Sequence, residues 1–263
     1  IERLRTCPGI FTRAAWPERK SSRLATYLIE VLDIAAALIF IAGSICFLPF
    51  YAANLQVFFL GCFLFIVGSL LYCIICMFTF GEAYSSKGSL AFEVWENGLY
   101  LAGSILFLIG SVLYLPPEDQ AKAINKIVSL GQICDEFSYL HNQLLGTVLF
   151  IVGSVLFIFA AFTNLMSEQK GELWSIRLLK AVTSCYMGGS LLFALGSVAF
   201  LPHLGCGEHM VMLGAWCFII GSALFLLGSV VSMARTVWVL NGPEAERLLP
   251  RPPEVRSADG VPK

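Results

Sequence analysis

Long apolar runs alternate with short polar segments along the whole chain. Six runs are each about long enough to cross the ~30 Å hydrocarbon layer of a bilayer as a helix. They lie near 25–48, 54–79, 97–115, 143–164, 181–201 and 210–233. The runs do not alternate in polarity as the strands of a membrane barrel do, and backbone in lipid must bond to itself. The pattern therefore predicts six transmembrane helices.

Five-residue motifs of one kind recur inside these runs. Each run carries Phe-x-x-Gly-Ser, beginning at Phe40, Phe65, Phe107, Phe150, Phe193 and Phe218. The segments 35–49, 102–116 and 188–202 align without a gap, and so do 60–72, 145–157 and 213–225. This register predicts a threefold tandem repeat of one two-helix unit. Each unit turns at a proline, because proline disfavours helix at the residue before it; these are Pro49, Pro116 and Pro202.

The repeat divides the chain into five segments. A basic N-terminal segment covers 1–24, the three hairpin repeats cover 25–80, 89–166 and 174–234, and a tail covers 240–263. The tail is rich in proline and charge and poor in apolar residues, so it is predicted to be disordered.

Glycines recur in the runs at a spacing of seven residues, which keeps them on one face of a helix. They are Gly43, Gly61, Gly68, Gly103, Gly110, Gly146, Gly153, Gly189, Gly196, Gly214, Gly221 and Gly228, with Ala36 in place of a glycine ahead of Gly43. Lipid gives helices no hydrophobic reason to associate, and small residues let backbones touch. The expected fold is an all-α membrane protein in which three antiparallel hairpins pack into one bundle. Distance from the turns predicts that Gly43 meets Gly61, Gly110 meets Gly146 and Gly196 meets Gly214.

Composition agrees with a membrane protein. The chain is 57% hydrophobic and 13% charged, whereas a soluble domain of this size carries about twice that charged share. Of its 17 lysines and arginines, all but Lys122 and Lys126 fall on the side that holds both termini. Positive residues mark the cytoplasmic side, so both termini are expected in the cytoplasm, or in the matrix or stroma of an organelle. The basic N-terminus is interpreted as a topology signal, with contact to anionic lipid as the alternative.

Candidate metal ligands gather on the opposite side. They are His141, His203 and His209, with Cys134 and Cys206. Imidazole and thiolate are common transition-metal ligands, so a metal ion or a haem is an alternative here, as is a Cys134–Cys206 disulfide. No HxxxH, HExxH or paired CxxC spacing supports such a site, and the preferred expectation is no cofactor.

Three other features inside the helices are interpreted as structural. Cys73 and Cys76 form a CxxC in an apolar helix, without the thiolate stabilisation that redox chemistry needs. Glu30 and Asp33 either form a proton or cation site or, as preferred here, lie at the membrane interface and meet basic neighbours at Arg19, Lys20 or Arg23. The serines of the motif are expected to pack helices. The alternative is that rows of serines line a polar path, which would need a central ionisable group or several amides, and none is identified.

The repeated unit resembles a known family. A hairpin with FLIGSVLYLP on one helix and LLGTVLFIVGSVLF on the other is similar to the YrhK-like domains, small membrane domains with this Phe-x-x-Gly-Ser pattern. The resemblance covers residues 25–233 in three copies and implies a fold without an assigned activity.

No phosphate loop, catalytic triad or nucleic-acid patch is present in the sequence. The preferred hypothesis is a non-enzymatic integral membrane protein, a structural subunit or scaffold whose partners are the bilayer and other membrane subunits and not nucleic acid. A small-solute or ion transporter or channel is the first alternative, which threefold repetition would suit. A metal- or haem-binding membrane protein is the second.

Overall fold

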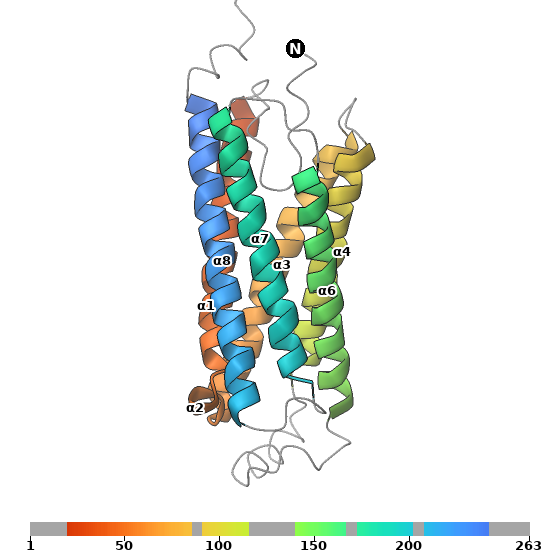
Figure 1. Ribbon diagram of the computed structural model, residues 1–263, viewed down its shortest axis with the longest axis vertical. Coiled ribbons are helices and arrows are strands. Elements are labelled where there is room, and N and C mark those ends of the chain that lie inside the picture. The colour runs from red at the N-terminus through yellow and green to blue at the C-terminus, as the bar shows by residue number, and fades with distance from the viewer. Residues whose placement is uncertain (1–19, 86–90, 116–139, 167–172, 202–207, 242–263) are drawn as a thin grey trace, which may run out of the picture.

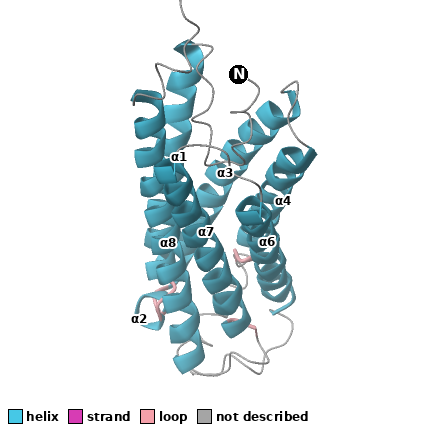
Figure 2. Cartoon of the chain, turned by 45° about the horizontal axis from the view of Figure 1, so that its top comes forward, coloured by secondary structure: helices cyan, strands magenta, loops and turns pink. Residues whose placement is uncertain are grey.

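The computed structural model describes residues 20–85, 91–115, 140–166, 173–201 and 208–241. These residues form seven helices and no strand, which confirms the expected helical class (Figure 2). The short helix α2, Pro49–Ala52, lies in the first turn. The six long helices are α1 Lys20–Cys46, α3 Leu55–Ser85, α4 Ala91–Leu113, α6 Leu140–Met166, α7 Leu173–Ala199 and α8 Glu208–Asn241.

Each long helix contains a stretch of 20 to 32 residues that is apolar enough to cross a membrane. Three of these stretches pass the limits expected from the sequence by three residues or more: Val94–Leu113 begins before 97, Trp174–Ala199 begins before 181, and His209–Leu240 ends after 233. The expected limits are too short because they stop at the nearest charged residue. The longer helices bring Glu96 and Arg235 inside the apolar stretches.

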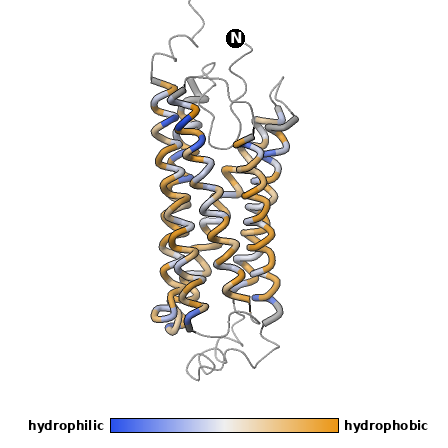
Figure 3. Tube along the Cα trace, viewed as in Figure 1, coloured by the Kyte–Doolittle hydropathy of each residue, from blue (hydrophilic) through white to orange (hydrophobic). Residues whose placement is uncertain are grey.

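The long helices are apolar over most of their length (Figure 3). Large side chains such as Leu191 and Leu195 are about half exposed, at 51% and 52%. An apolar surface this extensive is stable in lipid and would aggregate in water. The apolar helices therefore indicate an integral membrane protein.

The six long helices form a closed ring (Figure 1). Each packs mainly against two others, in the order α1, α3, α4, α6, α7, α8 and back to α1. Helices consecutive in the sequence are thus neighbours, and the last packs against the first. We call the end at which α1, α4 and α7 begin, at the top of Figure 1, the upper end of the bundle.

The phenylalanines of the six motifs meet on the axis of this ring. We call them the phenylalanine layer: Phe40, Phe65, Phe107, Phe150, Phe193 and Phe218, all 5% exposed or less. The two rings of each neighbouring pair α1–α3, α4–α6 and α7–α8 have centroids 5.0 to 5.2 Å apart. Rings from different pairs lie 5.8 to 6.3 Å apart. These are ordinary contact distances between aromatic side chains, so the layer fills the middle of the bundle.

The motif glycines lie where two helices come closest. A Cβ added to Gly110 would stand 3.0 Å from the carbonyl oxygen of Gly146, and one added to Gly196 would stand 3.0 Å from that of Gly214. One added to Gly61 would stand 3.3 Å from the carbonyl oxygen of Gly43. The helices at these points are thus in backbone contact, which a larger residue would prevent.

The motif serines lie on the other flank of each helix. Ser44, Ser111 and Ser197 each donate to the carbonyl oxygen four residues earlier, at 2.7 to 2.8 Å. Two serine pairs also join helices: Ser44 and Ser222 join α1 to α8, and Ser69 and Ser111 join α3 to α4, each with oxygens 3.3 Å apart. Ser154 Oγ on α6 has no hydrogen-bond partner, so this contact is not repeated between α6 and α7.

Candidate buried polar site

Ionisable and amide side chains are buried in the upper part of the bundle. They come from four helices: Glu30 and Asp33 on α1, Glu96 and Asn97 on α4, Asn164 on α6 and Arg235 on α8. All are 3% exposed or less. The interior therefore contains ionisable groups and amides beyond the Glu30 and Asp33 that the sequence analysis considered. Glu96 and Arg235 lie just outside the expected runs, and Asn97 and Asn164 are the end residues of theirs.

The expected interfacial position of Glu30 and Asp33 is wrong. Glu30 is 3% exposed and Asp33 is 1% exposed, and both accept hydrogen bonds from other helices. The physical reason is that the side chains at these positions face the axis of the helix bundle and not its outer surface. Of the basic neighbours expected for them, Arg19 and the side chains of Lys20 and Arg23 lie outside the described part of the chain.

The two carboxylates of α1 are held by hydroxyl groups. Asp33 Oδ2 accepts a 2.6 Å hydrogen bond from Tyr186 Oη, which also lies 2.9 Å from Ser229 Oγ. Glu30 Oε1 accepts bonds from Ser232 at 3.0 Å and from Thr236 at 2.8 Å. An O–H···O distance of about 2.6 Å is typical of a bond to an ionised carboxylate.

Two further polar contacts join helices at the same end. Asn164 Nδ2 donates to Glu96 Oε1 at 2.8 Å, which links α6 to α4. Arg235 Nε donates to the carbonyl oxygen of Ser175 at 3.2 Å and lies 3.1 Å from Ser175 Oγ, which links α8 to α7. Buried polar groups in a membrane must find partners inside the protein, and these bonds supply them.

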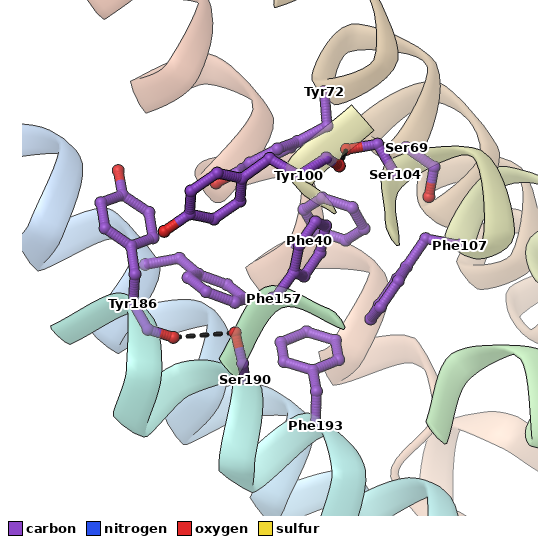
Figure 4. Close-up of a pocket in the computed structure, with 11 residues that line it drawn as sticks. Phe40, Ser69, Tyr72, Tyr100, Ser104, Phe107, Phe157, Tyr186, Ser190 and Phe193 are labelled. Atoms are coloured by element: carbon purple, nitrogen blue, oxygen red, sulfur yellow. Dashed lines mark hydrogen bonds between the residues drawn. The ribbon is translucent and has the colours of Figure 1, made fainter. Parts of the chain in front are cut away.

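A small cavity lies between the phenylalanine layer and these polar groups (Figure 4). Its volume is about 20 Å³, which is room for about one water molecule. Phenylalanine and tyrosine rings form most of its wall, including Tyr72, Tyr100 and Tyr186. Ser104 and Ser190 also line it, but their hydroxyls donate to carbonyl oxygens of their own helices. The cavity is too small to bind an organic ligand.

Sequence spacing would have placed these tyrosines. Tyr100 and Tyr186 precede Phe107 and Phe193 by seven residues, and Tyr72 follows Phe65 by seven in a helix of opposite direction. Heptad spacing keeps a residue on the same face, so each tyrosine lies on the axis one step above the phenylalanine layer. Asp33 precedes Phe40 by the same interval, which explains its burial.

The ligands considered for a metal ion, a haem or a disulfide are not brought together among the described residues. His209 is exposed near the beginning of α8, while His203, Cys134, Cys206 and the side chain of His141 lie outside the described part of the chain. No three His, Cys, Asp or Glu side chains within that part are grouped to hold a metal ion. Cys73 and Cys76 are buried free thiols, and Cys76 Sγ lies 3.1 Å from Ser104 Oγ.

The hydroxyl of Tyr186 tests how strongly the site is held together. Tyr186→Phe keeps the ring and removes the donor to Asp33, and we expect it to lower the free energy of unfolding by about 1 to 2 kcal/mol. Tyr114→Phe is the matched control, because its hydroxyl lies 3.2 Å from the neutral Thr147 Oγ1; its loss should be about 0.6 kcal/mol. Unfolding in mixed detergent micelles measures both, and equal losses would contradict a charge-assisted bond.

Comparison with known proteins locates one family match. Residues 177–237, which cover most of α7 and α8, match the family described as YrhK-like protein. The match gives no evidence for three tandem copies, since it covers one pair of helices where three were expected. No curated protein and no solved structure matches the chain.

Proposed function

We propose that this chain is a non-enzymatic integral membrane protein that serves as a structural subunit or scaffold of a membrane complex. The observation that carries the proposal is the phenylalanine layer, in which rings from all six long helices are in contact on the axis. Rings at these separations leave no continuous water path through the middle of the bundle. A sealed interior suits a protein that acts through its outer surface and loops.

We propose further that the bundle is built of three related hairpins held together by glycine and serine stripes. Equivalent motif positions support this: the phenylalanine faces the axis, and the glycine faces the helix that follows or precedes it in the same hairpin. The serines of two of the three hairpin junctions pair across them. The family match on α7 and α8 supports a YrhK-like origin for the third hairpin, and the common motif extends this proposal to the other two.

The proposed orientation places both termini in the cytoplasm, or in the matrix or stroma. Exposed Arg177 and Lys180 on α7 near the upper end support it, because positive residues are retained on that side. Four exposed aromatic residues lie at this same end: Tyr84, Trp95, Trp174 and Trp238. Tyrosine and tryptophan concentrate at the membrane–water interface, so the upper end matches one surface of the bilayer.

Two measurements test the scaffold proposal. The purified full-length chain, reconstituted into sealed vesicles, is expected to leave the leak of Na⁺, K⁺ and a small neutral solute at the rate of protein-free vesicles. Solubilised in a mild detergent, it is expected to run on a native gel well above its own 28.8 kDa, in fixed ratio with another membrane protein. Solute flux above the protein-free rate, or recovery of the chain by itself, would contradict the proposal.

A small-cation transporter is the second candidate, favoured by the buried carboxylates Glu30 and Asp33. Ionisable groups inside a membrane bundle are costly and commonly mark ion or proton sites. Transport would additionally require the phenylalanine layer to open. The vesicle assay separates the two candidates, because only a transporter accelerates the movement of its cation.

A further inference from the structure

The carboxylates of Glu30 and Asp33 lie well inside the membrane-spanning part of α1. The apolar stretch of this helix begins at Leu24, so their Cα atoms are about 9 and 14 Å from its start at 1.5 Å per residue. The two residues are three positions apart and therefore neighbours on one helix face. A pair of acidic groups at this depth needs positive charge or many donors nearby.

Each of these carboxylates has only one of its two oxygens bonded. Ser232 and Thr236 donate to Glu30 Oε1, while Glu30 Oε2 has no hydrogen-bond partner. Tyr186 donates to Asp33 Oδ2, while Asp33 Oδ1 has none. Both oxygens are buried, so the structure holds two acceptors without a donor beside each other on one helix.

A third oxygen, the hydroxyl of Tyr72, lies close to Asp33. Tyr72 on α3 is 8% exposed, and its hydroxyl makes no hydrogen bond of standard length and angle, although it lies close enough to Asp33 for a weaker polar interaction. The residue lines the cavity together with Tyr186 (Figure 4), and it interacts electrostatically with Asp33, as Glu30 does. A buried hydroxyl without a partner costs about 1 to 3 kcal/mol, which a ligand at this point would recover.

The ionised groups around this site carry one more negative charge than positive charge. Arg235 is the one buried cation among the described side chains. It interacts with Glu30, and its Nε is engaged with Ser175. Two carboxylates against one guanidinium leave a net charge of −1 when both acids are ionised.

We propose that Glu30 Oε2, Asp33 Oδ1 and Tyr72 Oη bind one small monovalent cation, Na⁺. Carboxylate and hydroxyl oxygens are ligands for hard cations, and a single positive charge neutralises the site. The adjoining cavity has room for one water molecule to complete the coordination. The site does not depend on the scaffold role: a sealed bundle can bind the ion without transporting it.

Thermal unfolding of the purified full-length chain in detergent tests the site. Na⁺ is titrated against N-methyl-D-glucamine at constant chloride and constant pH. A ligand at a hundred times its dissociation constant is expected to raise the melting temperature by about 5 °C in a protein of this size, and the rise should saturate. A melting temperature that responds equally to both cations would overturn the proposal. So would one that responds to pH alone, which would assign the position to a proton.

Substitutions then locate the ion. Asp33→Asn and Glu30→Gln are each expected to abolish the Na⁺-dependent shift. Asp33→Asn also weakens the bond from Tyr186, and Glu30→Gln also removes a charge that interacts with Arg235, so the result is read from the dependence on Na⁺ and not from the melting temperature itself. Glu96→Gln is the matched control: its carboxyl is equally buried but lies on α4, where it accepts from Asn164 of α6, so the shift should remain. A shift that survives in both α1 variants would place Na⁺ elsewhere and refute this site. If a variant does not fold, the titration of the unsubstituted chain still decides whether Na⁺ binds.

Discussion

Replacing Phe193 with alanine should destabilise the bundle by about 3 to 5 kcal/mol, the usual cost of truncating a buried aromatic side chain. Phe193 is 1% exposed, and it contacts as many rings as Phe65 and more than the other members of the phenylalanine layer. Its centroid lies 5.0 Å from that of Phe218 and 5.4 Å from that of Phe225. Neighbouring rings cannot fill the space it would leave, because each is held by its own helix at a fixed position in the ring.

Leu195→Ala is the matched control for Phe193→Ala. Leu195 lies two residues further along α7 and is 52% exposed on the outer surface. Lipid or detergent chains occupy the volume that a truncated surface residue leaves, so the expected loss is well under 1 kcal/mol. Both variants are compared by equilibrium unfolding in mixed micelles, followed by far-UV circular dichroism. Similar losses for the two would show that the phenylalanine layer does not hold the bundle together.

The three named residues of the Phe-x-x-Gly-Ser motif face three different directions around their helix, and this arrangement explains how the helices form a ring. At about 100° per residue, the glycine of Phe-x-x-Gly-Ser lies about 60° to one side of the phenylalanine and the serine about 40° to the other. In a neighbouring helix of opposite direction the two sides are exchanged. Glycine therefore meets glycine across the contacts α1–α3, α4–α6 and α7–α8, and serine meets serine across two of the three remaining contacts, α8–α1 and α3–α4, with phenylalanine on the axis throughout. The observed Gly110–Gly146 and Ser69–Ser111 contacts have this arrangement.

The part of the fold that could be predicted from the sequence is the part that the seven-residue spacing determines, namely which faces of the helices lie inside the bundle. Continuous apolar runs predict helices in lipid, and heptad-spaced glycines indicate which faces come close. The same period could have been applied to the residues seven positions from each motif phenylalanine. It would have placed Tyr100 and Tyr186 on the axis, and Asp33 with them.

The sequence analysis missed most of the polar site because it judged each helix by its own hydropathy, as if lipid surrounded that helix on all sides. A span limited at its nearest charged residue treats lipid as the only solvent, and so it excluded Glu96 and Arg235. In the bundle these side chains face other helices, and Asn164 and Ser175 supply their hydrogen bonds. Which charged residues face inward depends on contacts between segments far apart in the sequence, such as Tyr186 and Asp33, and no local pattern encodes those contacts.

A second large effect is expected for Gly189→Ala. The added Cβ would stand 2.9 Å from the carbonyl oxygen of Gly221 and 3.0 Å from a ring carbon of Phe225. Backbone cannot move aside at the first of these contacts without separating α7 from α8. Overpacking of this kind costs about 2 to 3 kcal/mol, more than the helix propensity gained from alanine.

Gly188→Ala provides the control within the same helix, one residue away. Its Cβ would meet only Leu224 Cδ1, at 3.4 Å, which is ordinary contact with the end of a flexible side chain. Alanine there should leave the free energy of unfolding unchanged or raise it by up to about 1 kcal/mol, because alanine favours helix over glycine. The two variants thus share chemistry and helix position but differ in the face they occupy. Equal shifts of the unfolding midpoint in the same direction would contradict this prediction. They would show that backbone contact between α7 and α8 does not stabilise this pair of helices, and that the spaced glycines are not required for it.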